Sequence, residues 1–152
     1  MLMKKSKRFE PIQEIVSTSA NDLGRAMAEA GRKVADLEKQ LEQLQNYRDE
    51  YTRNSQAGGA MDAVKLQNYR MFLERLGEAL RMHLKNLENA RAEYETRRRL
   101  WSEKRVEAES LSRAVDRFRR EEQHAADLRE QREGDDAALR ISLAGSSDNT
   151  NR

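Results

Sequence analysis

The sequence predicts an all-α protein, a long antiparallel two-helix coiled-coil hairpin with arms of unequal length. Charged residues make up 37% of the 152 residues and hydrophobic residues another 37%, a balance typical of long amphipathic helices. Seven glycines and one proline supply few of the turns that a globular fold of this length needs. Apolar side chains recur in alternating steps of four and three residues, the repeat that keeps one seam of a helix against a partner.

The first helix is predicted from residue 9 to residue 53. Its seam positions are apolar with the exceptions of Gln13 and Arg48, and the run lacks the alternation of a strand. These positions are Phe9, Gln13, Val16, Ala20, Leu23, Met27, Ala30, Val34, Leu37, Leu41, Leu44, Arg48 and Tyr51.

The apolar repeat stops at residues 54–61, which contain the adjacent glycines Gly58 and Gly59. Adjacent glycines have the backbone freedom for a chain reversal and are costly inside a helix. We therefore predict the turn at residues 54–61, with Asp62 as the N-cap of the second helix. Folding about the two glycines would place Leu44 near Leu73 and Leu41 near Leu76.

The second helix is predicted to continue to about Arg132, well beyond the length of the first. Its seam positions are Leu66, Tyr69, Leu73, Leu76, Leu80, His83, Leu87, Ala90, Tyr94, Arg97, Trp101, Lys104, Ala108, Leu111, Val115 and Phe118. The first arm would end opposite Ala108, leaving Leu111, Val115 and Phe118 without a partner in the chain. A two-helix hairpin buries little surface by itself, so this stripe favours a protein partner or a dimer.

Three regions follow from these boundaries. Residues 1–8 are expected to form a basic flexible arm and residues 9–133 the hairpin. Residues 134–152 form a short segment rich in Gly, Ser and Asn and are expected to be a disordered tail.

One flank of the predicted seam carries an aromatic pair close to the turn. In an antiparallel pair the heptad g positions of both helices line one flank, where charged residues are usual. Tyr47 and Phe72 both fall at g, which indicates a protein-binding patch; the alternative is that they only cover the edge of the seam. The g flank contains Gln40, Tyr47, Phe72 and Ala79, is continuous with Leu44, Tyr51, Leu76 and His83, and lies opposite Gly31, Glu38, Gln45, Arg70 and Gly77.

Basic side chains gather in runs at residues 4–8, 97–99 and 117–120. Residues 91–120 carry ten basic and six acidic side chains, whereas residues 121–136 carry two basic and seven acidic. The first and last basic runs lie at one end of the predicted hairpin, an arrangement that suits an acidic cavity or ring. The alternative is that these runs are solvated helix faces.

Trp101, between the seam positions Arg97 and Lys104, indicates a soft spot in the coil or a place where the hairpin flexes or a partner inserts.

The sequence contains no pattern typical of catalysis. It has no cysteine and two distant histidines, His83 and His124, so no metal site or cofactor is expected. His83 is expected to be a seam residue or an interface contact. Exposed carboxylates on two helices have no cavity to shift their pKa values, so we expect a non-enzyme.

A net charge of +2 and the absence of a long apolar run predict a cytoplasmic protein without nucleic-acid binding or membrane insertion.

Three segments carry a resemblance to a known family: LEQLQNYRDEY at residues 41–51, LQNYRMFLERLGEAL at residues 66–80 and WSEKR at residues 101–105. Over residues 9–130 the chain resembles the flagellar export protein family FliJ. The resemblance implies a two-helix coiled coil like the γ stalk of rotary ATPases, which assists the flagellar type III export ATPase. The chain departs from the family at Pro11, at its basic start and beyond Gly134.

The resemblance also implies the partners. The free helical ends would enter the export ATPase hexamer and support its assembly and activity, while the side near the turn would bind the cytoplasmic domain of the export-gate membrane protein; export chaperones are further partners. This places the protein at the inner membrane of the flagellar base. The implied gate-binding residues are Gln40, Leu44, Tyr47, Tyr51, Phe72, Leu76, Ala79 and His83. We expect the ATPase contacts at Arg8, Phe9, Leu111, Val115, Arg117, Phe118 and Arg119.

Two other functions are compatible with the residues alone. One is an unrelated coiled-coil adaptor. The other is a nucleic-acid-binding hairpin that uses Arg97–Arg99 and Arg117–Arg120; its binding would weaken steeply with salt.

Overall fold

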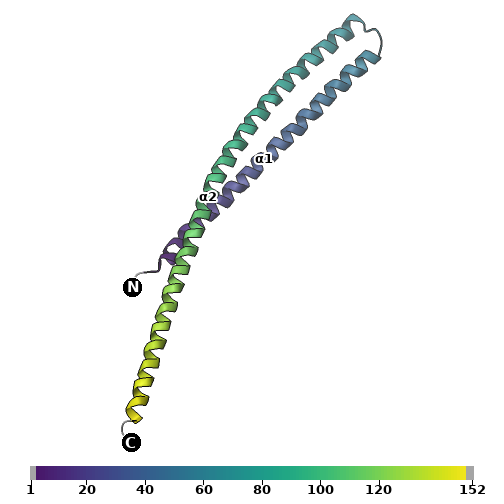
Figure 1. Ribbon diagram of the computed structural model, residues 1–152. Coiled ribbons are helices and arrows are strands. Elements are labelled where there is room, and N and C mark those ends of the chain that lie inside the picture. The colour runs from purple at the N-terminus through teal and green to yellow at the C-terminus, as the bar shows by residue number, and fades with distance from the viewer. Residues whose placement is uncertain (1–2, 150–152) are drawn as a thin grey trace. The chain divides into compact units, whose positions relative to one another are not determined.

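Two helices account for nearly all of the computed structural model, which describes residues 3–149 (Figure 1). Helix α1 spans Lys5–Ala57 and helix α2 spans Ala63–Asn149. They are antiparallel and are joined by residues 58–62, and the described residues contain no strand. The predicted all-α helical hairpin with unequal arms is confirmed.

The hairpin divides into two units, which are described separately below. The turn unit is residues 19–105 and contains the reversal of the chain. The terminal unit combines the start of α1 with the later part of α2, and its described residues are 3–18 and 106–149.

The turn is shorter than predicted because α1 continues through residues 54–57 before it ends. Gly59 has a φ of +81°, a conformation that glycine adopts without the steric penalty of a Cβ. Asp62 is the predicted N-cap: its Oδ1 accepts a hydrogen bond of 2.8 Å from the backbone N–H of Lys65. The reversal therefore uses both local signals that the sequence contains.

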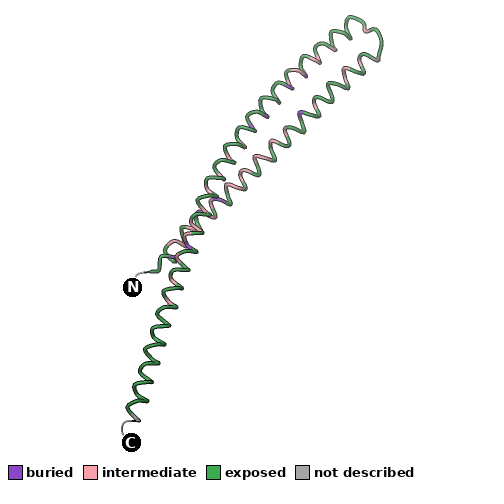
Figure 2. The backbone as a smooth tube through the Cα atoms, in the orientation of Figure 1, coloured by how far each residue is buried: buried purple, intermediate pink, exposed green. Residues whose placement is uncertain are grey.

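The seam of the turn unit is the predicted one (Figure 2). Leu41, Leu76, Leu80 and Leu87 form its buried cluster. Of the predicted seam positions in this unit, Arg48 and Leu66 are exposed and the others are buried or half-buried. The 3.5-residue repeat thus selected the buried face correctly.

Near the turn Leu41 and Leu76 share one cluster as predicted, but further from the turn the facing residues of the two helices differ from the prediction. Gly31 lies against Tyr94 and Gly24 against Trp101, so α1 meets residues further along α2 than expected. One cause lies at the turn. The connection is centred near Ala60, whereas the prediction centred it on Gly58 and Gly59. Moving the centre of a turn by one residue changes, by two residues, which position of α2 faces a given position of α1. The remaining offset accumulates along the pair.

The predicted overhang of the apolar stripe of α2 beyond α1 is wrong. Val115 is completely buried, and the rings of Phe9 and Phe118 pack with centroids 5.4 Å apart. The stripe of Leu111, Val115 and Phe118 is therefore covered within the chain. The offset between the helices and the start of α1 at Lys5 together bring α1 opposite this stripe.

The ends of the chain are more helical than predicted. Residues 5–8, expected in a flexible arm, belong to α1, and residues 134–149, expected in a disordered tail, belong to α2. Residues 1–2 and 150–152 of these predicted regions lie outside the described residues. Residues 123–147 are exposed apart from Ala126 (Figure 2), so their helix rests on strong helix formers such as Ala137, Ala138 and Leu139 rather than on packing.

Candidate partner-binding surfaces

The aromatic side chains near the turn form one connected group. Tyr51 stacks on Tyr69 with centroids 5.4 Å apart and meets Phe72 at 4.2 Å. Tyr47 contacts the same Phe72 edge-on at 6.0 Å. Tyr47 therefore lies beside Phe72, as the heptad assignment predicted, and Tyr69 is an additional member that the sequence analysis had treated only as a seam residue.

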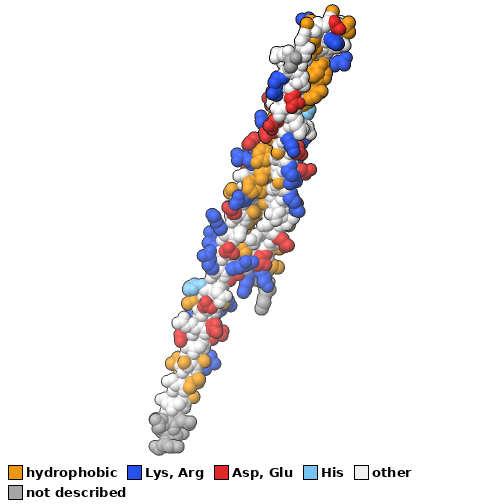
Figure 3. Space-filling model, turned by 90° about the vertical axis from the view of Figure 1, so that its right-hand side faces the viewer, with side chains coloured by type: hydrophobic (Ala, Val, Ile, Leu, Met, Phe, Trp, Pro, Cys, Tyr) orange, Lys and Arg blue, Asp and Glu red, His pale blue; other side chains and the backbone are white. Residues whose placement is uncertain are grey.

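The rings of this group differ in exposure. Tyr47 is 51% exposed, whereas Tyr51, Tyr69 and Phe72 are half-buried. Several other apolar side chains near the turn are also exposed, and Figure 3 shows apolar side chains gathered in this region. Tyr47 consequently presents the largest accessible part of the aromatic group to a partner.

A pocket of about 340 Å³ lies next to this group and is lined by Gln40, Gln43, Leu44 and His83. The structure thus brings together three of the residues that the resemblance implied for gate binding, and adds Gln43. Nδ1 of His83 is enclosed and has no hydrogen-bond partner within residues 3–149. A buried polar atom without a partner costs free energy, and because Nδ1 has almost no accessible surface, a donor from another molecule would reach it only after the surrounding side chains move.

The remaining two residues of the implied gate site have lower exposure. Leu76 is buried in the seam cluster, and Ala79 is half-buried. Leu76 therefore supports the surface from below rather than presenting a free side chain.

The expected ATPase residues lie together in the terminal unit but differ in availability. Arg8 and Arg117 are exposed, Phe9, Leu111 and Phe118 are half-buried, and Val115 is fully buried. Arg119 is paired with Glu10 at 2.7 Å. Val115 can thus act only by supporting the surface.

Polar contacts that the sequence analysis did not identify hold the start of α1 in this unit. The carboxylate of Glu122 accepts hydrogen bonds from the Ser6 backbone N–H at 3.1 Å and from its hydroxyl at 2.6 Å. These bonds lower the pKa of Glu122, because they stabilise its ionised form. The hydrogen bond from Arg119 to Glu10 raises the pKa of the guanidinium. A carboxylate at a helix start is also favoured by the helix dipole.

Trp101 packs into the side of α1 in the turn unit. A Cβ placed on Gly24 would lie 3.0 Å from Nε1 of Trp101, and one on Gly31 would lie 3.3 Å from the ring of Tyr94. The two glycines and the two rings are each seven residues apart, so the same contact is made twice. Trp101 is therefore a packed side chain in a position that the sequence predicted as a soft spot.

Neither helix contains, within residues 3–149, a stretch long and apolar enough to cross a membrane. Over the same part of the chain, no three His, Cys, Asp or Glu side chains are grouped in a way that could hold a metal ion.

Comparison with known protein families decides the identity. A family model described as flagellar FliJ protein matches residues 4–146. The chain belongs to the FliJ family. The resemblance inferred from residues 9–130 is thereby confirmed, and the match extends across both units. Neither the curated proteins nor the solved structures contain a significant match to the chain.

FliJ proteins are non-catalytic components of the flagellar protein export apparatus. Membership assigns the chain to this apparatus and to the flagellar base.

Proposed function

We propose that this FliJ protein is a coupling and assembly subunit of flagellar export, which binds the export ATPase through its terminal unit and the cytoplasmic domain of the export-gate protein through the aromatic flank of its turn unit. In this proposal the protein supports ATP hydrolysis and export, meets export chaperones, and works in the cytoplasm against the inner membrane. The exposed Tyr47 beside Phe72 carries the proposal, because an aromatic pair is unusual on a coiled-coil flank.

The gate surface proposed here has an aromatic part and a polar part. Tyr47 supplies exposed apolar area, and the neighbouring pocket has the polar side chains of Gln40, Gln43 and His83 in its lining. Interfaces commonly depend on an aromatic anchor of this kind.

The decisive experiment measures binding of the gate's cytoplasmic domain to the full chain by calorimetry. Tyr47→Ala should weaken binding by about 2 kcal/mol, which is about 30-fold in affinity. The melting temperature should change little, because half of this side chain is already exposed. Phe72→Ala should also weaken binding, and it should lower stability because the Phe72 ring contacts the rings of Tyr47 and Tyr51.

Matched controls lie on the opposite flank of the same helices. Gln45→Ala and Arg70→Ala remove exposed side chains at a similar distance from the turn and should leave gate affinity unchanged. If Tyr47→Ala binds the gate as tightly as these two variants, the aromatic pair only covers the seam and the proposed gate site is wrong.

The ATPase surface is tested through its exposed cations. The double variant Arg8→Glu/Arg117→Glu should reduce stimulation of ATP hydrolysis by the export ATPase, because it reverses the charge offered to an acidic ring. Arg140→Glu, an exposed change in the same unit, is the control. Full stimulation by the double variant, with normal helicity, would exclude this surface as the ATPase contact.

A further inference from the structure

We propose that the flank of the turn unit opposite the aromatic group, which we call the arginine flank, binds an acidic amphipathic helix of a partner protein. The arginine flank is defined by Arg91, Arg98 and Arg105, which follow one another at seven-residue intervals on α2, and by the grooves beside them. This site is additional to the two surfaces of the proposed function.

The arginine flank contains two grooves with apolar floors. One, of about 500 Å³, is lined by Met27, Tyr94, Trp101, Arg98 and Arg99 among others. The other, of about 600 Å³, is lined by Leu84, Leu87, Arg81, Lys85, Glu88 and Arg91. The bond of 3.0 Å from Arg91 to Glu38 of α1 places Arg91 on the flank that contains Glu38.

Glycine explains why the first groove has an aromatic floor. Gly24 and Gly31 present no side chain on α1, so the rings of Trp101 and Tyr94 lie directly against its backbone. A larger residue at either position would displace the rings. The two rings thus lie where leucine or phenylalanine side chains of an added helix could pack on them, at the repeat of helix-in-groove recognition.

The net positive charge of the turn unit comes from residues 91–105, the stretch of α2 that supplies most of the lining of the first groove. Residues 19–90 carry eleven basic and eleven acidic side chains, whereas residues 91–105 carry six basic and three acidic. The whole excess of three positive charges therefore lies in residues 91–105. Within residues 3–149, Arg81, Lys85 and Arg99 make no ion pair, so these cations remain available to an acidic partner.

The occupant is better matched by an acidic helix than by nucleic acid. Glu88, Glu95 and Glu103 line the same grooves, so carboxylates interrupt the cations of the flank and no continuous basic stripe is present to follow a phosphate backbone. The apolar floor would also remain unused by phosphates. An amphipathic helix with leucines on one face and carboxylates on the others would cover the floor and pair with Arg81, Lys85 and Arg99.

Trp101 makes the proposal directly measurable, because it is the only tryptophan of the chain. The probe is a synthetic helical peptide of about 18 residues with leucines along one face and glutamates elsewhere. Titrated into the full chain, it should shift the Trp101 emission to shorter wavelength and saturate in the micromolar range. A peptide with lysines in place of the glutamates, and one with the leucine face scrambled, should each bind at least tenfold more weakly.

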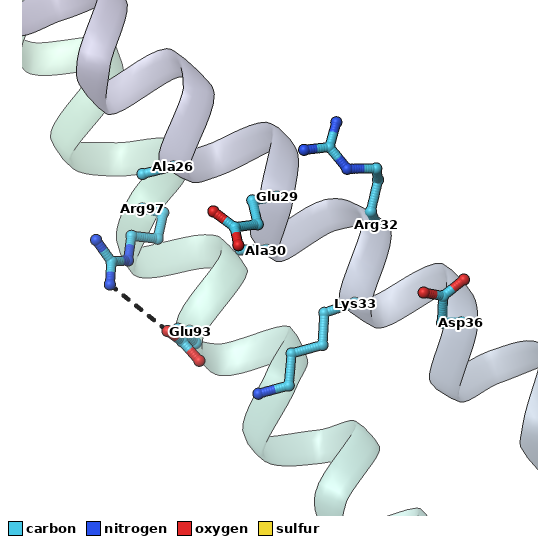
Figure 4. A pocket seen from close by; sticks show the side chains of 8 residues that line it. All are labelled: Ala26, Glu29, Ala30, Arg32, Lys33, Asp36, Glu93 and Arg97. Carbon is cyan, nitrogen blue, oxygen red and sulfur yellow. Dashed lines mark ion pairs between the residues drawn. The ribbon is translucent and has the colours of Figure 1, made fainter.

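The matched variants test the location. Arg98→Ala/Arg99→Ala removes two exposed adjacent cations and should weaken binding of the acidic peptide about tenfold. The control is Arg32→Ala/Lys33→Ala, an equivalent pair beside a groove of mixed charge formed with Glu29, Glu93 and Arg97 (Figure 4). There Lys33 reaches towards α2 and Arg32 points away. The control should bind the peptide within twofold of the unchanged chain.

Four outcomes would overturn the proposal. The first is no saturable shift with the acidic peptide, and the second is equal binding by the scrambled or lysine peptide. The third is binding of a labelled DNA duplex that depends on Arg98 and Arg99 while the acidic peptide does not bind, which would assign the flank to nucleic acid. The fourth is self-association in sedimentation that Arg98→Ala/Arg99→Ala abolishes and the peptide cannot displace, which would make a second copy the occupant.

Discussion

The turn unit and the terminal unit differ in the exposure of their aromatic side chains. Near the turn, Tyr47 remains half exposed and rests edge-on against Phe72. In the terminal unit, Phe9 and Phe118 are packed against each other, with Lys5 and Arg117 lying over the Phe118 ring. The turn unit therefore has one exposed ring, Tyr47, in addition to its packed aromatic side chains, whereas both aromatic residues of the terminal unit belong to the helix contact.

The polar groups of the two units show a parallel difference. His83 in the turn unit has an enclosed nitrogen without a hydrogen bond in the described chain. In the terminal unit the buried Ser6 is satisfied twice by Glu122, and Arg119 is paired with Glu10. Exposed rings and polar groups without hydrogen bonds favour binding of another molecule. Polar groups that are hydrogen-bonded between the two helices instead stabilise the contact between them. The ATPase contact proposed for the terminal unit therefore depends on its outward-facing arginines and not on its apolar stripe.

The largest effect is expected at the centre of the terminal unit. Val115→Asp would place a carboxylate where no solvent reaches, and should cost about 3 kcal/mol or more. Hydrogen exchange of residues 5–18 should rise strongly in this variant. Val106→Asp, at a position that is 60% exposed, is the control and should leave exchange unchanged. Equal protection in both variants would show that the terminal unit does not depend on this packing.

A smaller effect, with a difference in sign, is expected from two glycines of the turn unit. In Gly77→Ala the added Cβ would contact only the Arg81 side chain, at 3.7 Å. This substitution should therefore stabilise the helix by about 0.5–1 kcal/mol. Gly24→Ala gains the same helix propensity but collides with Trp101, so its free energy of unfolding should lie about 1–2 kcal/mol lower than that of Gly77→Ala. Urea unfolding gives the energies, and Trp101 emission should change in Gly24→Ala alone. Equal stabilisation by both changes would show that Trp101 yields without cost.

The N-cap of α2 provides the next smaller test. Asp62→Ala removes the oxygen that accepts from Lys65 and should lower the free energy of unfolding by about 1 kcal/mol. Asp49→Ala, an exposed change inside α1, should remain within about 0.5 kcal/mol of the unchanged chain. Thermal melting followed by circular dichroism distinguishes them, and an equal loss in both would contradict the capping role.

The smallest effect concerns the pH dependence at the start of α1. Because the pKa of Glu122 is lowered below its ordinary value of 4.5, the stabilisation is present above that value and is lost as the pH falls through the lowered pKa. The amide protection factor of Ser6 should therefore fall on acidification. Glu122→Gln should have low protection at every pH, while global unfolding changes little.

The neighbouring variant Glu121→Gln keeps the carboxylate that binds Ser6 and should retain the full pH dependence. If Glu122→Gln and the unchanged chain respond to pH in the same way, the hydrogen bonds from Ser6 do not hold the start of α1.

The sequence by itself determined the fold, the seam and the family. Its 3.5-residue repeat identifies the buried face of each helix, because only that spacing keeps apolar side chains towards one partner. Gly59 and Asp62 specify the reversal through local backbone chemistry, and the heptad letters place Tyr47 beside Phe72. These features depend on neighbours in sequence or on strict periodicity, so one sequence is sufficient to find them.

Away from the turn, the tertiary structure alone decided which residues face each other across the seam. A heptad repeat is satisfied equally well after a shift of one repeat, so it cannot distinguish Trp101 from its neighbours as the residue against Gly24. For the same reason the coverage of Val115 and the contact between Ser6 and Glu122 were not predicted. Such contacts join residues far apart in the chain, and their energies depend on the offset between the two helices.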